Sequence, residues 1–316
     1  MISVLLASHN GADTIDHTLK AMSRLTAPPG GWELIVVNNA SSDETESLVL
    51  KWRERLPLKY LVEHQLGKSK AINTGLAASK GDFIVMTDDD VLPDRNWLCE
   101  WRRMADAFPD IDVFSGAVVP EFVAAKPPDY VSDASYGALY GAHVPDIEGE
   151  IKPCAPSELI EVSGANLAMR RSAYQQGNRL DEIYLVGDTG LMGEDTDFVN
   201  RMAKAGHKVG YAPEPRVRHI VHAHQTKLSW IFRRFCSNGR ARFMLAKAQW
   251  NEGARRHALL LPFRHAAGLV GSSARMVAAL GVGNRHEAFR QMSGFAYDMG
   301  ALQQALSVYW HHIVGH

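Results

Sequence analysis

Short apolar runs alternate with amphipathic segments of helical length over the first part of the chain. Runs of strand length lie at residues 2–8, 33–38, 58–62, 83–87 and 113–119, and helical patterns lie between them at 13–23, 43–55, 68–79 and 94–108. Alternation of strands and helices at this spacing is typical of βαβ units. The pattern predicts an α/β fold with a mostly parallel central sheet, in which Ser42 or Asp43 caps the second helix.

The pattern changes after the fifth strand. Pro, Gly, Asp and Tyr are frequent at 120–157, which indicates irregular loops of the kind that often carry binding surfaces. Further elements are expected as strands at 159–169 and 216–218, and as helices at 194–205, 230–248, 258–280 and 287–313. The chain therefore changes from mixed α/β to all-helical near residue 226.

Charge is distributed unevenly between these two parts. The 316 residues are 46% apolar, which allows a sizeable core, and their formal net charge is −1. Residues 216–316 contain 14 Lys and Arg against 3 Asp and Glu, a net charge of +11, whereas residues 1–215 contain 20 against 32, a net charge of −12. The acidic part is suited to holding a cation, and the basic part to facing phosphates or an anionic membrane surface.

Cysteine usage and hydropathy indicate the compartment. Cys99, Cys154 and Cys236 are far apart and lack CxxC spacing, which argues against a disulfide framework or a zinc site. No run of about 18 apolar residues occurs, and the best candidate, at 266–282, contains Arg275. We therefore expect no transmembrane span and a cytoplasmic location, with a peripheral position on the inner face of the cell membrane left open.

Asp88, Asp89 and Asp90 follow directly after the apolar run at 83–87 and give the strongest signal of chemistry. Three carboxylates at the end of a buried strand repel one another, and a divalent cation relieves the repulsion because hard oxygen ligands suit Mg²⁺ or Mn²⁺. The carboxyl end of a parallel strand is also where open α/β sheets bind ligands. The cluster predicts a metal site that holds the phosphates of a nucleotide; the alternative is a solvated turn.

A second acidic cluster begins an expected helix and comprises Glu194, Asp195 and Asp197. One carboxylate there would cap the helix, but three in four positions exceed what capping needs, so one of them is a candidate general base for an acceptor hydroxyl. His219 follows the strand-like 216–218 and is a candidate distant ligand of the metal held by the first cluster. A site of histidines alone, with His222 and His224, is the alternative, although this spacing matches no familiar zinc pattern.

Weaker signals lie at two strand ends and one helix start. They are Ser8, His9 and Asn10 after the first strand, Asn38 and Asn39 after the second, and Gly67 and Lys68 at the third helix. Hydroxyls and amides at adjacent strand ends are able to read a nucleobase and ribose through hydrogen bonds, although turn and cap chemistry also explains each of them. The helix start suits phosphate, through backbone N–H groups and a lysine, but lacks P-loop spacing.

Taken in order, these motifs resemble the family 2 glycosyltransferases, which have the GT-A fold. The resemblance covers about residues 1–240. It rests on Ala-Ser-His-Asn at 7–10, Val-Val-Asn-Asn-Ala-Ser-Ser-Asp at 36–43, Gly-Lys with Ala-Ile-Asn-Thr-Gly at 67–75, Thr-Asp-Asp-Asp at 87–90, Ser-Gly-Ala-Asn at 163–166 and Gly-Glu-Asp at 193–195.

The resemblance implies roles for particular positions. The implied metal ligands are Asp90, Asp88 and His219, and the implied catalytic base of an inverting reaction is Asp195, with Glu194 as its acidic companion. The positions expected to contact the nucleotide are Ala7, Ser8, Asn10, Asn38, Asn39, Gly67, Lys68, Asp88 and Asp89. Those expected beside the donor sugar and acceptor are Gly164, Ala165, Asn166 and Trp230.

Two departures from the family pattern bear on specificity. Asn38 and Asn39 stand where members commonly carry an Asp that contacts uracil, so a UDP-sugar is favoured while dTDP- and GDP-sugars stay open. The Gln-x-x-Arg-Trp motif that processive members share is absent, although Trp230 and the pair Arg233–Arg234 are present, which argues for transfer of a single sugar.

The resemblance thus implies an inverting, Mn²⁺- or Mg²⁺-dependent transferase that moves one sugar from a nucleotide-diphosphate sugar to a sugar or lipid-linked acceptor in polysaccharide or glycoconjugate assembly. We expect a catalytic domain at 1–225, with a nucleotide-binding half at 1–119 and an acceptor half at 120–225, and a basic helical region at 226–316. The helical region is expected to form a homodimer or to bind an anionic membrane, and nucleic acid is not an expected partner. A sugar nucleotidyltransferase and a non-catalytic scaffold of a polysaccharide assembly complex are the alternatives.

Overall fold

The computed structural model describes residues 1–124, 126–131, 135–144, 160–175, 177–183, 192–248 and 261–314. The chain divides into two compact units. The first comprises Met1–Glu121, Gly141–Leu185 and Glu194–Ile220, and the second Phe122–Tyr140, Val186–Gly193 and Val221–His316. Cys154, the parts 125, 132–134 and 145–157 of the expected loop region, residue 159 of an expected strand and residues 258–260 of an expected helix lie outside the described residues.

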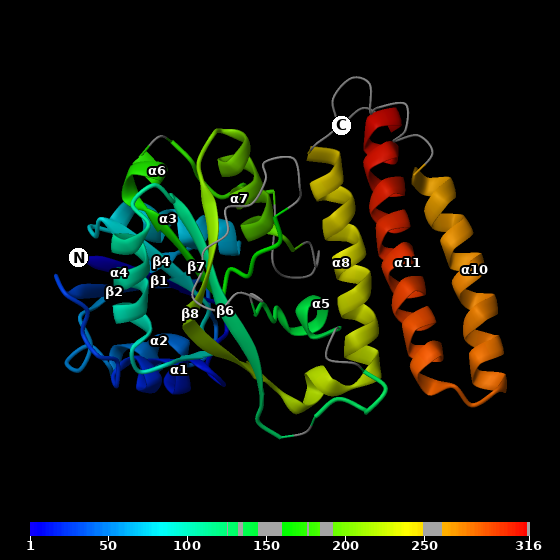
Figure 1. Cartoon of the computed structure of the whole chain (residues 1–316), viewed down its shortest axis with the longest axis horizontal. Helices are drawn as coiled ribbons and strands as arrows, with labels where there is room; N and C mark the ends of the chain where they lie inside the picture. Colours follow the sequence, from blue (N-terminus) through cyan, green and yellow to red (C-terminus); the bar gives the residue numbers. More distant parts are fainter. Residues whose placement is uncertain are drawn as a thin grey trace. The chain divides into compact units, whose positions relative to one another are not determined.

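A central sheet organises the first unit (Figure 1). Across the described residues it has eight strands in the order β3-β2-β1-β4-β7-β6-β8-β5. The strands are β1 (Ile2–Ser8), β2 (Trp32–Asn39), β3 (Leu58–Glu63), β4 (Phe83–Thr87), β5 (Val91–Pro93), β6 (Val113–Phe122), β7 (Asn166–Arg170) and β8 (Val209–Val221). The pairs β1–β2, β2–β3 and β1–β4 are parallel, whereas β4–β7, β6–β7 and β5–β8 are antiparallel. The parallel sheet predicted from sequence therefore accounts for the first four strands, whereas β7 and β5 each run antiparallel to the neighbours given above.

Helices follow the strands as the amphipathic pattern predicts. Those of the first unit are α1 (Ile15–Met22), α2 (Thr45–Leu50), α3 (Lys68–Ala78), α4 (Trp97–Ala107), α6 (Arg171–Gln175) and α7 (Glu194–Lys204). The expected cap of α2 was wrong, because Glu44 occupies the N-cap position. Asp43 instead accepts the N–H of Thr45, the first helical residue, at 3.0 Å. The expected strand at 159–169 is shorter, since only its end belongs to β7.

Alternating strand residues build two apolar layers, one on each face of the sheet. On one face Ile2, Val4 and Leu6 of β1 pack in a cluster with side chains of α1 and α4. On the other face Leu5 packs in a cluster with side chains of α3 and α7. Successive side chains of a strand point to opposite faces, so a strand buried on both faces reads as a continuous apolar run. This burial fixes the register of β1 and β4, and with it the position of the polar residues that follow them.

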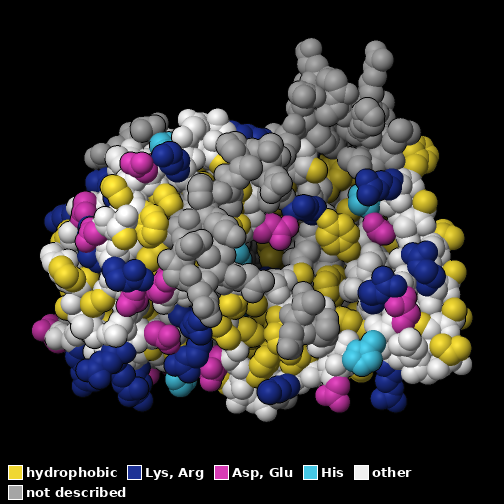
Figure 2. Space-filling model, in the orientation of Figure 1, with side chains coloured by type: hydrophobic (Ala, Val, Ile, Leu, Met, Phe, Trp, Pro, Cys, Tyr) yellow, Lys and Arg dark blue, Asp and Glu magenta, His cyan; other side chains and the backbone are white. Residues whose placement is uncertain are grey.

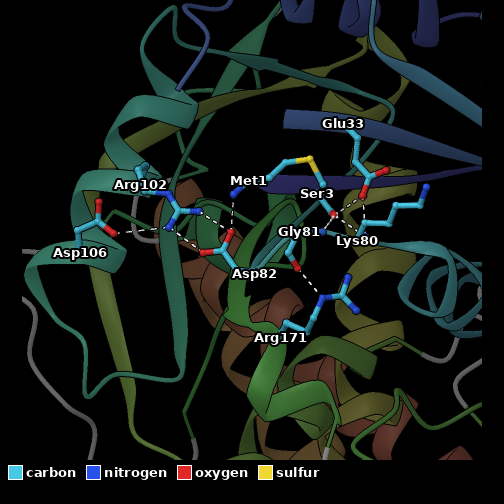
Figure 3. Close-up of polar contacts among 9 residues, drawn as sticks. All are labelled: Met1, Ser3, Glu33, Lys80, Gly81, Asp82, Arg102, Asp106 and Arg171. Carbon is cyan, nitrogen blue, oxygen red and sulfur yellow. Dashed lines mark hydrogen bonds and ion pairs between the residues drawn. The ribbon is translucent and has the colours of Figure 1, made fainter. Parts of the chain in front are cut away.

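A polar network holds the amino-terminal ends of β1 and β4 (Figure 3). Arg102 of α4 binds both carboxylate oxygens of Asp82, at 2.9 and 3.1 Å. Arg171 donates to the carbonyl of Gly81 at 2.5 Å, and the N–H of Gly81 donates to Ser3 Oγ at 2.7 Å. These contacts lie at the opposite end of the strands from Asp88–Asp90, so they fix the strands without using the site residues.

Beyond residue 222, the described parts of the second unit are mainly helical. It contains α5 (Tyr136–Tyr140), the 3₁₀ turn η2 (Ala223–Thr226), α8 (Leu228–Ala248), α10 (Leu261–Gly281) and α11 (Arg285–Val314). The helix α11 packs against both α8 and α10 (Figure 1). Aromatic side chains dominate its core, including the stacked rings of Tyr140 and Trp230. No helix in the described part of the chain is long and apolar enough to cross a membrane.

Candidate active site

The carboxyl ends of β1 and β4 bring the first acidic cluster together. The two strands are parallel neighbours with Leu6 opposite Thr87, so the residues that follow them meet at one edge of the sheet. Ser8 Oγ donates a hydrogen bond to the carboxylate of Asp89. The chain then turns into β5, which pairs with β8 so that Val91 lies opposite His219. The predicted proximity of His219 to this cluster is therefore a consequence of the sheet.

Asp90 and His219 form a partly buried pair whose side chains are both able to bind a metal ion. His219 Nε2 lies 3.0 Å from Asp90 Oδ2, and the side chains are 15% and 27% exposed for His219 and Asp90. Burial alone would raise the pKa of Asp90, but the adjacent His219 and Lys68 outweigh it and lower that pKa. Asp90 Oδ1 is buried and has no hydrogen-bond partner among the described residues. An acceptor atom left in this way needs a cation or a water, because a buried carboxylate oxygen without a partner is costly.

The carboxylate of Asp90 and the imidazole of His219 fit a hard divalent cation that takes its remaining ligands from a bound substrate. No group of three or more His, Cys, Asp or Glu side chains in the described ranges is arranged to hold a metal by itself. Mg²⁺-type sites commonly use one or two carboxylates and take further ligands from substrate phosphates and water. Asp90 and His219 suit such a partial site. Asp88, the third ligand predicted from sequence, contacts Lys68, and its role as a metal ligand stays a prediction.

Lys68 connects the two acidic clusters. Its Nζ lies 2.6 Å from Asp88 Oδ1 and 3.5 Å from Glu194 Oε1. Burial opposes its charge, but attraction to Asp88 and Glu194 outweighs burial and raises the pKa of Lys68 above its usual range. The side chains of Lys68, Asp88 and Glu194 are 26%, 23% and 7% exposed. Residues that are distant in sequence thus meet around the side chain of Lys68.

Asp195 lies at the start of α7 and is held by backbone donors. Gly164 N–H donates to Asp195 Oδ2 at 2.5 Å, and Thr196 N–H donates to Oδ1 at 2.7 Å. Burial, followed by repulsion from Glu194, raises the pKa of Asp195 from 3.8 to about 6. A carboxylate with its pKa near neutrality is ionised at physiological pH and still able to take up a proton, which suits a general base.

Asp89 and Gly11 form a feature that sequence reasoning missed. Burial, followed by repulsion from Asp90, raises the pKa of Asp89 to about 7. A Cβ atom on Gly11 would overlap the Asp89 carboxylate and Ser8 Oγ. Thr18 of α1 also donates to the Asp89 carbonyl, at 2.8 Å. The sequence signal that could have revealed this contact is Gly11 itself, which follows the polar residues at the end of β1. Glycine is common where the backbone closely approaches another segment.

The amides after β1 and β2 tie loops together. Asn39 donates to the carbonyls of Glu63 and Gln65, at 3.2 and 2.8 Å, and its own oxygen accepts the N–H of Gly67 at 2.8 Å. Asn38 donates to Tyr60 Oη at 2.8 Å. Asn10 accepts the N–H of Ser42 at 2.8 Å. Asn38 and Asn39 are buried, so the structure uses Asn39 to position the loop before Lys68. The contacts of Asn10, Asn38 and Asn39 with a nucleotide stay predictions.

The residues expected beside the sugar differ in their surroundings. Gly164 contacts Asp195, as described, and Ala165 accepts a hydrogen bond from Thr87 at 2.8 Å. Asn166 is fully buried, donates to the carbonyls of Ala117 and Pro215, and accepts from Trp97 at 2.9 Å. These bonds hold β7 in place. Trp230 belongs to the second unit, where its ring stacks on Tyr140 with the ring centroids 5.9 Å apart.

The site has three chemical capacities in one unit of the protein. Asp90 and His219 offer ligands to a hard cation. Lys68 offers a positive charge at the start of α3, where helix N–H groups also favour anions. Asp195 offers a base on a rigid helix start. Cationic groups beside a base suit reactions in which a phosphorylated group departs while a hydroxyl attacks.

Comparison with known families agrees with this chemistry. The model of the family described as "Glycosyl transferase family 2" matches residues 3–177. That span contains β1–β7 and the first acidic cluster, and it ends before α7.

Curated relatives are also glycosyltransferases. The chain is 32% identical over 180 residues to the pre-mycofactocin glycosyltransferase of Mycobacterium tuberculosis, covering 56% of this chain and 35% of that protein. It is 39% identical over 99 residues to the probable glycosyltransferase YdaM of Bacillus subtilis, covering 30% of this chain and 24% of that protein. The chain therefore spans about a third or less of the length of these relatives.

Solved structures show the same fold at low sequence identity. The mannosyltransferase PcManGT of Pyrobaculum calidifontis, in complex with GDP-Man and Mn²⁺, has a TM-score of 0.63 and 21% identity, covering 96% of this chain and 86% of that one. TarS of Staphylococcus aureus, in complex with UDP, has a TM-score of 0.53 and 14% identity, covering 96% and 91%. The predicted fold class, a GT-A fold with C-terminal helices, is thus confirmed.

Proposed function

The chain belongs to glycosyl transferase family 2, and on that premise we propose that it transfers a single sugar, with inversion, from a nucleotide-diphosphate sugar to an acceptor hydroxyl. The observation that supports this most strongly is the pair of contacts made by Lys68 with Asp88 and Glu194. They bring a candidate leaving-group site and a candidate base into one constellation.

We assign the proton transfer to Asp195. Its carboxylate removes the proton of the attacking hydroxyl while that oxygen forms a bond to the anomeric carbon and the bond from this carbon to the diphosphate oxygen breaks. The electron pair leaves with the nucleoside diphosphate. One attack from the face opposite the leaving group inverts the anomeric configuration. The N–H groups of Gly164 and Thr196 hold the carboxylate in one orientation during this step.

The leaving diphosphate requires positive charge. We propose that Asp90 and His219, with Asp88 nearby, hold Mn²⁺ or Mg²⁺ together with the donor phosphates. When bound, the metal would neutralise the charge that develops on the departing group. The ion in the PcManGT complex, Mn²⁺, is consistent with this choice. Lys68 contributes a second positive charge from the start of α3.

We propose that the nucleotide lies against the carboxyl ends of β1 and β2. Ala7 and Ser8 end β1 and Asn10 follows it, while Asn38 and Asn39 end β2, which is the parallel neighbour of β1. Gly67 and Lys68, with Asp88 and Asp89, would face the phosphates. Structures similar to this chain were solved with different nucleotides, GDP-Man in one and UDP in another, so UDP-, dTDP- and GDP-sugars all need testing.

The acceptor is proposed as a sugar or a lipid-linked sugar of polysaccharide or glycoconjugate assembly. Relatives include poly-β-1,6-N-acetyl-D-glucosamine synthases of staphylococci, which supports this class. Gly164, Ala165, Asn166 and Trp230 remain the residues proposed to lie near the donor sugar or acceptor. Homodimer formation and peripheral association with an anionic membrane are proposed for the basic C-terminal helices.

The experiment is a donor screen followed by one substitution. Nucleoside diphosphates should raise the melting temperature in the presence of Mn²⁺, since a ligand that binds only the native state stabilises it. The nucleotide that binds identifies the donor for a transfer assay. Asp195→Asn should retain nucleotide binding and lose transfer; near-normal turnover would reject Asp195 as base. Release of pyrophosphate would indicate a nucleotidyltransferase. If no nucleotide binds, the protein would instead be a non-catalytic scaffold.

A further inference from the structure

The outer face of α10 is apolar and exposed. Phe263, Val270 and Val277 are 73%, 73% and 66% exposed. They are seven residues apart, which is close to two helical turns, so they share one face of the helix. Leu280 and Val282 continue the apolar surface at the end of the helix, with 60% and 81% exposure. This surface, defined by these five side chains, is called the outer face of α10.

The opposite side of α10 is fixed against α11. His265 Nδ1 lies 2.7 Å from Asp298 Oδ1. Arg275 donates to Gln291 at 2.9 Å. Ser272 and Ala279 are buried. The helix is therefore held in one rotation, and its apolar face is directed away from the core of the unit. Exposed contiguous apolar surface of this kind usually marks an interaction site.

The charges around the outer face of α10 indicate what kind of partner it binds. No Asp or Glu occurs from residue 261 to residue 286, whereas Arg264 and Arg285 are exposed there. The two carboxylates of α11 are already engaged, Asp298 by His265 and Glu287 by Arg290 at 2.8 Å. In Figure 2, hydrophobic side chains recur along the right-hand edge, where α10 lies in Figure 1, with Lys or Arg side chains beside them. The occupant should be apolar and negatively charged.

We propose that the outer face of α10 lies on an anionic lipid bilayer, with Phe263, Val270 and Val277 inserted into the headgroup region and the flanking arginines facing lipid phosphates. An amphipathic helix of this kind lies in the plane of the interface. A second copy of the chain is a poorer occupant, because a region with net charge +11 would face an identical one. This inference rests on the membrane association proposed above and assigns it to a defined surface. Binding to vesicles is measured without substrates, so its result does not depend on transferase activity.

The test is flotation of the full chain with vesicles, without substrates. Wild-type protein should bind phosphatidylcholine vesicles that contain about 30% phosphatidylglycerol, bind pure phosphatidylcholine at least tenfold more weakly, and dissociate at about 0.5 M NaCl. The triple variant Phe263→Ser, Val270→Ser, Val277→Ser should lose at least tenfold in binding. Because the three side chains are exposed, the variant should fold, which circular dichroism checks.

A control variant removes three exposed apolar side chains elsewhere in the chain. Val62, Val123 and Ile183 are 42%, 56% and 53% exposed and lie outside α10. Their replacement by Ser should leave vesicle binding unchanged. Arg264→Glu should weaken binding to anionic vesicles selectively. Equal binding of both triple variants, or no binding by wild type, would overturn the proposal. So would a wild-type dimer, seen by analytical ultracentrifugation, that the α10 variant converts to monomer.

Discussion

Asp195→Asn should make the protein more stable at neutral pH while removing its proposed activity. The pKa of Asp195 is raised from 3.8 to about 6, mainly by burial. A carboxyl group whose pKa is higher in the folded state binds protons more tightly there, so its stabilising effect is present below about pH 4 and is lost as the pH rises through about 6. Above that pH the charged carboxylate destabilises the fold. An amide, which does not ionise, avoids this cost.

The size of the effect follows from the shift and from the lost hydrogen bond. A difference of about two pKa units corresponds to about 3 kcal/mol, and partial exposure of Asp195 reduces it to about 2 kcal/mol. An amide oxygen accepts only one of the two N–H bonds now made by Gly164 and Thr196, which costs about 1 kcal/mol. The variant should therefore be about 1 kcal/mol more stable than wild type at pH 8 and about 1 kcal/mol less stable at pH 4.

The assay is urea unfolding of both proteins at pH 4, 6 and 8, followed by circular dichroism. Titrating groups distant from Asp195 contribute equally to both proteins and cancel in the difference, whereas the interactions of Asp195 with Glu194 and Lys68 are part of the measured effect. Asp110→Asn serves as the control, because the Asp110 side chain is 81% exposed and its replacement should change the free energy of unfolding by less than about 0.5 kcal/mol. A stability difference for Asp195→Asn that stays constant with pH, or favours wild type at pH 8, would refute the electrostatic account of this residue.

Further predictions concern the groups around Asp195. Lys68→Met should lower the free energy of unfolding by roughly 2–4 kcal/mol, since it leaves two largely buried carboxylates without their cation. Lys208→Met, which breaks an exposed ion pair, should lower it by less than about 1 kcal/mol in the same urea titration. His219→Ala should abolish the rise in melting temperature caused by Mn²⁺ with a bound nucleoside diphosphate; an unchanged rise would exclude His219 as a ligand. Gly11→Ala should displace Asp89 and destabilise the protein by about 1–3 kcal/mol, measured by urea unfolding. Wild-type kcat/KM should increase as the pH rises through about 6, following ionisation of Asp195; a pH-independent profile would contradict its role as base.

The sequence predicted the parallel half of the sheet well because local patterns determine it. The strands β1, β2 and β4 each contain a continuous run of at least four apolar residues, and each of β1, β2 and β3 is followed by a helix. The rest of the sheet depends on pairing between distant segments, such as the antiparallel β7 between β4 and β6. Periodicity contains no information on which strands pair. The shortened β7 has the same cause, since residues 163–165 form a turn that directs Gly164 N–H toward Asp195.

Lys68 shows where sequence reasoning about the site stopped. Its position at a helix start predicted a contact with phosphate, because helix N–H groups and a lysine favour any anion. Which anion it meets depends on the ends of β4 and α7, and these supply Asp88 and Glu194. The same two carboxylates were predicted as parts of a metal site and a base. The sequence could identify every member of the cluster, but only the fold shows that a protein cation already lies between the two acidic groups. A nucleotide diphosphate that reaches Lys68 must therefore compete with Asp88 for it, which makes the Lys68–Asp88 pair the first contact to examine in a nucleotide complex.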